Sequence, residues 1–128
     1  MTPVRLVPGD DLRSALLRHA GNEGAFVVSG IGSLTQAAIR FAGRPDVEIL
    51  QGPLEIVSLA GTLTPDGAHL HVTVADGQGR MTGGHVGAGC IVRTTAEVLI
   101  APVFGYRLSR EPDPRTGYAE LAVRRDDA

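Results

Sequence analysis

The chain has 128 residues, of which 43% are hydrophobic, so it is long enough for one folded domain and too apolar for a disordered segment. Its formal net charge of −2 gives no basic excess of the kind that neutralises DNA phosphates. All 12 basic residues are arginines. Aromatic residues contribute only 4%, and we therefore expect a core of Val, Leu, Ile and Ala.

The sequence also predicts a cytoplasmic protein. It contains neither a signal-peptide pattern nor an apolar run long enough to span a membrane. The single cysteine, Cys90, cannot form an internal disulfide, which suits a reducing compartment. Because Cys90 lies within an apolar run, we interpret it as an inert core residue rather than a reactive thiol.

The first 24 residues predict one strand and one helix. Residues 4–7 have the composition of a short strand, which Pro8 and Gly9 end. Asp10 or Asp11 can then cap a helix, because a carboxylate accepts the free backbone N–H groups of the first turn. Apolar residues recur at helical spacing after this cap: Leu12, Ala15, Leu16, His19 and Ala20. We predict a helix of about four turns, ended by the glycines that follow.

From residue 25 onwards the pattern is typical of β-sheet. Apolar or alternating runs occur at residues 25–29, 34–42, 47–50, 54–63, 68–75, 91–103, 106–110 and 118–123. Residues 64–67 (TPDG) and 76–79 (DGQG) have turn sequences, and the first of these predicts a hairpin.

Together these elements predict a single α+β domain with a central antiparallel sheet, about eight short strands and one main N-terminal helix. We expect the domain to span residues 1–128, with its core at 4–123 and a frayed tail at 124–128. One helix covers only part of such a sheet, so a partner subunit is expected to bury some of the remaining face.

Three histidines form the strongest candidate site. His69 and His71 are two residues apart on a predicted strand, which places both imidazoles on one face of the sheet. His85 follows two glycines that allow a close approach of the backbone. Three neutral imidazoles can hold Zn²⁺ or a similar divalent ion with one coordination position open. The alternative is a structural role in which the imidazoles bond to loop carbonyls.

Three charged residues on predicted strands are further candidates. Glu97 lies in an apolar run, and a buried carboxylate needs a partner. It could serve as a general base or support a ligand histidine, but we favour a salt bridge to Arg40 or Arg93. Arg40 and Arg93 could themselves bind an anionic ligand, or form ion pairs at an edge or an interface.

Several sequence blocks, in their order and spacing, are similar to the PPC (plants and prokaryotes conserved, DUF296) family. The blocks are residues 8–12 (PGDDL), 29–34 (SGIGSL), 54–63 (LEIVSLAGTL), 69–72 (HLHV), 83–85 (GGH) and 89–97 (GCIVRTTAE). Residues 113–117 (DPRTG) add to the resemblance, which therefore covers nearly the whole chain.

The resemblance implies an α/β fold with a central antiparallel sheet and assembly into homotrimers. In plant members the domain follows AT-hook segments and takes part in nuclear protein assembly. Bacterial and archaeal members stand alone and are usually described as predicted DNA-binding proteins. The chain departs from the plant pattern, because residues 43–45 (GRP) lack the second arginine of an AT-hook and residues 52–57 (GPLEIV) replace the plant motif Gly-Arg-Phe-Glu-Ile-Leu.

Our leading hypothesis is a stand-alone PPC-type homotrimer with a regulatory, DNA-associated role and a divalent-metal site, for zinc, at His69, His71 and His85. The alternative is a metal-dependent hydrolase or lyase that acts on a small molecule. In that case Glu97 would be the base, and Arg40 or Arg93 would orient an anionic substrate.

Overall fold

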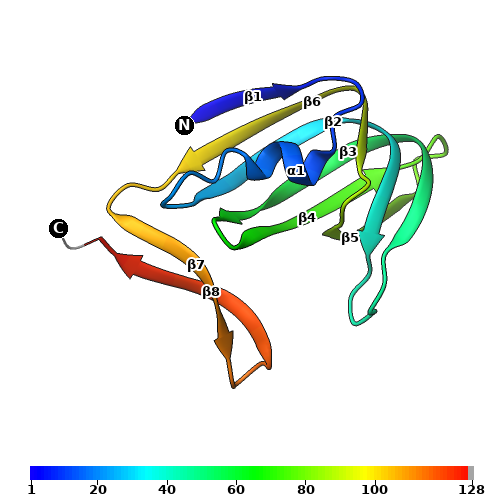
Figure 1. The fold of residues 1–128 in the computed structure, drawn as a ribbon. Coiled ribbons are helices and arrows are strands. Elements are labelled where there is room, and N and C mark those ends of the chain that lie inside the picture. The colour runs from blue at the N-terminus through cyan, green and yellow to red at the C-terminus, as the bar shows by residue number, and fades with distance from the viewer. Residues whose placement is uncertain (127–128) are drawn as a thin grey trace.

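The computed structural model describes residues 1–126 and consists mostly of antiparallel β-sheet with one short helix (Figure 1). Its elements are β1 (Thr2–Leu6), α1 (Leu12–Leu17), β2 (Ala25–Arg40), β3 (Glu48–Thr64), β4 (Gly67–Ala75), β5 (Met81–Val86), β6 (Ile91–Pro102), β7 (Tyr106–Asp113) and β8 (Tyr118–Arg125). Six strands form one sheet in the order β1-β6-β2-β3-β4-β5, and β7 pairs only with β8. The last strand of the large sheet, β5, also pairs with β2, so the sheet curls back on itself.

The prediction of a mainly antiparallel sheet is confirmed, but several strands are longer than predicted. β2 and β3 each span two predicted strands. β-Bulges allow the hydrogen-bonded pairing to continue where the sequence suggested a break. One such register shift lies between Leu34 and Gln36. At Gly32 an added Cβ would lie 2.5 Å from the Thr95 carbonyl oxygen, so this glycine allows β2 and β6 to approach closely. β5 was not predicted as a strand.

The predicted helix of four turns is wrong in length, since α1 has only 6 residues. Asp11 is its N-cap, as expected, and accepts a hydrogen bond from the Ser14 backbone N–H at 3.0 Å. After Leu17 the chain continues in tighter turns, in which the His19 N–H donates to the Leu16 carbonyl. These turns keep Ala20 buried, which explains why the apolar spacing continues beyond the helix.

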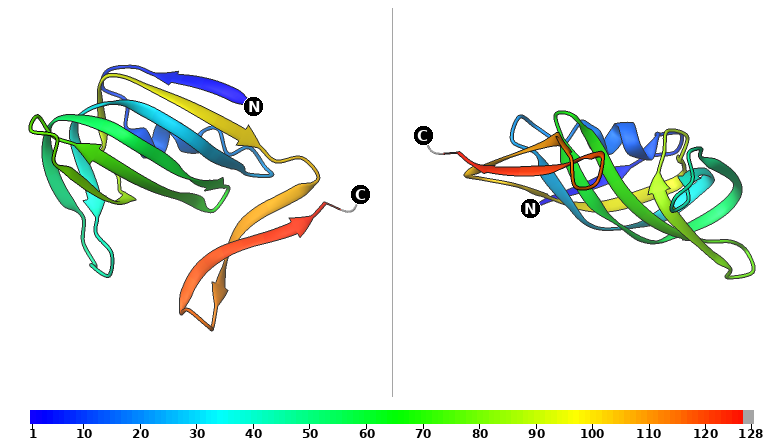
Figure 2. Two further views of the ribbon diagram at one scale, coloured as in Figure 1. Left: turned by 180° about the vertical axis from the view of Figure 1, so that it is seen from behind. Right: turned by 90° about the horizontal axis from the view of Figure 1, so that it is seen from below.

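The core lies between α1 and one face of the curled sheet, and Figure 2 shows the helix on one side of the strands. Leu12 and Leu16 of α1 are fully buried. Aliphatic residues supply the rest of this core, as the composition predicted, and among them Leu34, Ile39, Leu63, Leu70 and Ile100 are almost completely buried. The other face of the sheet carries exposed apolar side chains, including Phe26, Val28, Ile31 and Val57.

The β7–β8 hairpin projects from the main sheet and is fixed to it near its base (Figure 1). Leu108 is buried, and its backbone N–H donates to the Glu23 carbonyl at 2.8 Å. Pairing continues to the end of β8, where Arg124 lies opposite Arg107. Of the tail predicted to fray, Arg124 and Arg125 belong to β8, and the last two residues lie outside the described residues. Across residues 1–126, no helix combines the length and apolar character needed to cross a membrane.

The close contact between β3 and β4 gives a test of the fold. An added Cβ at Gly61 would lie 2.1 Å from the His69 carbonyl oxygen, whereas one at Gly77 would meet nothing within 4 Å. We expect Gly61→Ala to destabilise the protein by about 1–3 kcal/mol, because the strand backbones must separate. Thermal unfolding should show a melting temperature lower by several degrees for Gly61→Ala and almost unchanged for Gly77→Ala. Equal melting temperatures would contradict the strand register described above.

Candidate metal centre

The alternation of β4 places two histidines on one face of the sheet. His69 and His71 are exposed, whereas Leu70 and Val72, which alternate with them, are 2% exposed and belong to the core. Apolar residues at every second position thus fix which face the imidazoles occupy. The predicted strand and the predicted shared face are both confirmed.

The third histidine comes from the neighbouring strand. In the ladder between β4 and β5, His85 is the direct partner of His71, and in the short ladder between β5 and β2 it is the partner of Arg40. Both ladders require glycine before His85. An added Cβ would lie 2.6 Å from the Arg40 carbonyl oxygen at Gly84 and 2.9 Å from the Val72 carbonyl oxygen at Gly83.

The three imidazoles converge. Their ring centroids are 5.0 Å apart for His69 and His71, 5.4 Å for His69 and His85, and 4.7 Å for His71 and His85. One ring nitrogen from each lies within 4.8 Å of the other two. Nitrogens that share a tetrahedral Zn²⁺ at about 2.0–2.1 Å lie roughly 3.3 Å apart, so small rotations of these side chains would complete the site. The donor set therefore fits a divalent transition metal and leaves a position for a fourth ligand.

The electrostatic surroundings favour neutral imidazoles. Partial desolvation lowers the pKa of His69 below its ordinary value of 6.5, and Arg110, His71 and His85 lower it further while Glu120 opposes them. Burial likewise lowers the pKa of His85, with Arg40 and His71 adding to the effect. A metal ion binds the unprotonated ring nitrogen, so these shifts reduce the competition from protons at neutral pH.

A cavity of about 790 Å³ opens beside the histidines. His69 and His85 line it together with Arg40 from the end of β2, Arg13 from α1 and Arg110 from β7. Other lining residues include Arg44, Asp66, Tyr118 and Glu120. The cavity thus lies where the curled sheet, the helix and the hairpin meet.

The structure separates the charged candidates that the sequence grouped. Arg40 lies beside His85, but Arg93 and Glu97 are exposed on β6 and do not line this cavity. Glu97 faces Arg5 and Ile31 on the adjoining strands, and within residues 1–126 it forms no salt bridge with Arg40 or Arg93. The expectation of a buried Glu97 was wrong because β6 presents this position on the uncovered face of the sheet.

Sequence reasoning did not identify Arg13, Arg110 or Glu120 as site residues. They come from a helix and a hairpin that only the tertiary fold brings to the histidines, and no local pattern marks them. The reading of Cys90 is consistent with the structure, since the residue is fully buried and its thiol donates to the Ala38 carbonyl oxygen at 3.3 Å. Burial raises the pKa of this thiol, which disfavours the reactive thiolate.

Two curated relatives align with most of the chain. It is 49% identical over 124 residues to the bifunctional protein GlmU of Synechococcus sp. (strain JA-3-3Ab), a match that covers 94% of this chain and 20% of that protein. It is 34% identical over 111 residues to the AT-hook motif nuclear-localized protein 25 of Arabidopsis thaliana, covering 79% of this chain and 37% of that protein. The chain therefore spans about a fifth to about a third of the length of these relatives.

Solved structures share the whole fold. A Salmonella enterica protein is 38% identical with a TM-score of 0.94, and the match covers 98% of this chain and 93% of that one. A protein of Archaeoglobus fulgidus described as metal-containing is 27% identical with a TM-score of 0.79, covering 94% of this chain and 91% of that one. A plant- and prokaryote-conserved (PPC) protein of Pyrococcus horikoshii is 26% identical with a TM-score of 0.76, covering 94% and 90%.

The family match agrees with the resemblance found in the sequence blocks. The Plants and Prokaryotes Conserved (PCC) domain, the same family under another abbreviation, matches residues 2–104, which include all three histidines. With most of its length matched and its fold shared with a PPC protein of known structure, this chain belongs to the Plants and Prokaryotes Conserved domain family.

Proposed function

We propose that this protein binds one divalent transition-metal ion, Zn²⁺, through His69, His71 and His85. The observation that carries the proposal is the convergence of three imidazole nitrogens within 4.8 Å on two paired strands. The lowered pKa of His69 and of His85 supports it, because it disfavours the protonated ring, which cannot bind a metal ion. The description of the Archaeoglobus fulgidus relative as metal-containing adds support from a protein of the same fold.

We further propose that three copies of the chain form a homotrimer. The support is the uncovered face of the sheet, where Val28, Ile31 and Val57 line a shallow recess of about 450 Å³ and are each about half exposed. A sheet face with this much apolar surface gains from burial against another subunit. His71 also borders the recess, so a neighbouring subunit on this face would lie close to the metal ligands.

A regulatory, DNA-associated role is the finer part of the proposal and is inferred from relatedness. The support is the family itself and the Arabidopsis thaliana relative, which is named for its AT-hook motif and its nuclear localisation. The net charge of −2 gives this chain no basic excess, so contact with DNA would require basic residues gathered on one face of the assembly.

A second candidate function is a metal-dependent hydrolase or lyase that acts on a small molecule. The observation that favours it is the cavity beside His69 and His85, which would give a substrate access to an open coordination position. Glu97 does not line this cavity, so the base proposed from the sequence is replaced here by Glu120, a carboxylate that does.

The metal site predicts a stoichiometry. We expect close to one zinc ion per chain after incubation with Zn²⁺ and desalting, as measured by plasma mass spectrometry. His71→Ala should lower the content at least tenfold, because two imidazoles bind far more weakly than three. His19→Ala is the matched control, since His19 is exposed and lies outside the cluster. Metal at background level in the unmutated protein, or equal loss in both variants, would refute the site.

The metal-free protein should lose stability as the pH falls through about 6.5. The pKa of His69 and of His85 is below 6.5 in the folded chain, so the unfolded chain binds more protons in this range and gains stability relative to the fold. We expect the urea midpoint to decrease between pH 7.5 and pH 5.5. A double variant with glutamine at both positions should show a flatter profile. A midpoint that rises on acidification would contradict the lowered pKa values.

The trimer proposal predicts a mass. Sedimentation velocity should give a species of three times the 13.4 kDa subunit mass. Ile31→Arg should shift it towards the monomer, because it places a charge in the apolar face, whereas Val7→Arg, at an exposed loop position outside the recess, should leave it unchanged. A monomeric unmutated protein at micromolar concentration would exclude the trimer.

A further inference from the structure

The cavity beside the histidines is unusually rich in arginine. Arg13, Arg40, Arg44 and Arg110 all line it, and they come from the helix, the end of β2, the loop after β2 and the hairpin. Only two acidic residues, Asp66 and Glu120, accompany them. This distribution differs from that of the whole chain, where acidic residues outnumber basic ones.

The guanidinium groups are held in place by neutral acceptors. Arg13 donates to the Ala68 carbonyl oxygen at 3.3 Å, Arg40 donates to the Arg44 carbonyl oxygen at 3.1 Å, and Arg110 donates to the Thr62 hydroxyl. Each bond uses one N–H and leaves the other N–H groups of the guanidinium available. The three side chains are therefore oriented without being neutralised.

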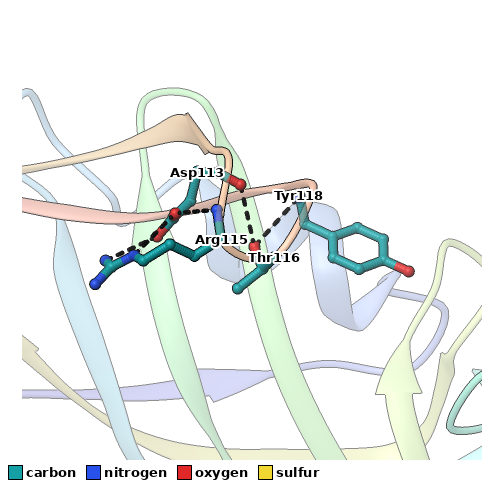
Figure 3. A network of polar contacts seen from close by, with 4 residues as sticks. All are labelled: Asp113, Arg115, Thr116 and Tyr118. Atoms are coloured by element: carbon teal, nitrogen blue, oxygen red, sulfur yellow. Dashed lines mark hydrogen bonds and ion pairs between the residues drawn. The ribbon is translucent and has the colours of Figure 1, made fainter.

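The salt bridges within residues 1–126 all lie elsewhere. They join Arg80 to Asp76, Arg107 to Asp126, Arg115 to Asp113 and Arg124 to Glu111. Figure 3 shows one of them at the tip of the hairpin, where Arg115 lies against Asp113 and the side chain of Tyr118 extends away from this pair. Within residues 1–126, four of the eight arginines outside the cavity form a salt bridge with a carboxylate, whereas none of the four that line the cavity does.

The two carboxylates of the cavity do not neutralise its arginines. Asp66 accepts a hydrogen bond from the backbone N–H of Arg110 at 3.0 Å, which ties the hairpin to the turn before β4. Among the described residues, neither Asp66 nor Glu120 lies within salt-bridge distance of a guanidinium. The guanidinium groups of the cavity are therefore available to bind an anionic ligand.

A smaller recess of about 210 Å³ adjoins the cavity. It shares Arg13, Arg40, His69 and His85 with the larger cavity and adds three apolar side chains: Val47, Leu70 and Val86. Of these three, only Val47 is exposed, since Leu70 and Val86 belong to the core. A small organic molecule can place its anionic group on the guanidinium groups and its carbon skeleton against Val47.

We propose that this cavity binds a small organic anion through its carboxylate or phosphate group, with Arg13, Arg40 and Arg110 as the guanidinium donors. The inference rests on the proposed metal site, because the ligand would lie beside His69 and His85 and could offer the ion a further oxygen. The volume falls in the usual range for small-molecule sites, roughly 300–1,000 Å³. Planar guanidinium groups with free N–H groups bind carboxylate and phosphate oxygens in pairs.

The same chemistry could also serve the phosphates of duplex DNA, but the observations favour a small molecule. The arginines come from four different segments and are gathered around one concave site, instead of forming a stripe along an exposed face. The net charge of the chain is −2. Binding to a long phosphate backbone depends on many cationic contacts spread over a surface.

The test is titration calorimetry with two probes, glycerol 3-phosphate and succinate, which separate a phosphate ligand from a carboxylate ligand. Each is titrated into metal-free and zinc-loaded protein at low ionic strength, and the zinc content of the same samples is measured. We expect saturable binding of at least one probe at one molecule per chain. Arg40→Gln should weaken it at least tenfold through the loss of charged hydrogen bonds.

Arg93→Gln is the matched control, because Arg93 is an exposed strand arginine outside the cavity, and it should leave binding unchanged. Arg13→Gln tests the donor on the helix. If it unfolds, Arg40→Gln carries the test alone, since the only hydrogen bond of that side chain among the described residues is to a loop carbonyl. Circular dichroism confirms that each variant is folded.

The outcomes separate the two proposals. Zinc-loaded protein that shows no saturable binding of either probe would overturn this inference and leave the metal site intact. Probe binding that depends on Arg40, in protein that takes up no zinc on incubation with Zn²⁺, would support the anion site and count against the metal site. Equal weakening by Arg93→Gln, or a 20-base-pair duplex that binds through Arg13 and Arg40 when neither probe does, would overturn the small-molecule assignment.

Discussion

The short pairing between β5 and β2 is the contact on which the arrangement of the site depends. It closes the curl of the sheet, and it does so through only two residue pairs, Ile39 with Val86 and Arg40 with His85. The backbones approach so closely that Gly84 has no room for a Cβ. Because side chains directly opposite one another in a ladder share a face, this one contact places Arg40, His85 and His71 in a row across three neighbouring strands.

That row places a cationic guanidinium group beside imidazoles that could bind a metal cation. Imidazoles are good metal ligands when neutral, and the adjacent guanidinium groups favour the neutral form. The same positive charges would repel a bound cation. An anionic ligand between the arginines and the ion would reduce that repulsion, so a proposed metal site and a proposed anion site each become more favourable when the other is occupied.

Much of the fold could be predicted from local patterns. The alternation of residues 68–75, the turn at 64–67 and the cap at Asp11 each have a local physical cause, and the structure contains all three. The continuous course of β2 and β3 could not be predicted, because bulges that hold a strand together across glycines depend on the partner strands. The prediction of the length of α1 failed for a related reason, since the tight turns after Leu17 keep the same apolar spacing as a helix.

The candidate site also has a part that local sequence patterns predict and a part that depends on the tertiary fold. The shared face of His69 and His71 follows from strand periodicity alone, and two glycines before His85 indicated a close approach without identifying the strand it would approach. Glu97 was misjudged, because an apolar run does not reveal which face of a sheet remains uncovered. Arg13 and Arg110 are about 97 positions apart in the chain, and only the docking of the hairpin brings them to one cavity.

The hairpin has one more consequence, for how such a protein can diversify. All three histidines lie within the segment matched by the family, residues 2–104, whereas Arg110, Tyr118 and Glu120 lie beyond it. One wall of the cavity is therefore formed by the β7–β8 hairpin, which is attached through Leu108 and Asp66 and whose strands pair only with each other. If the cavity binds a ligand as proposed, a different hairpin would change which ligand fits. The strands that carry the histidines would keep their register, so one sheet could be combined with different hairpins to bind different ligands.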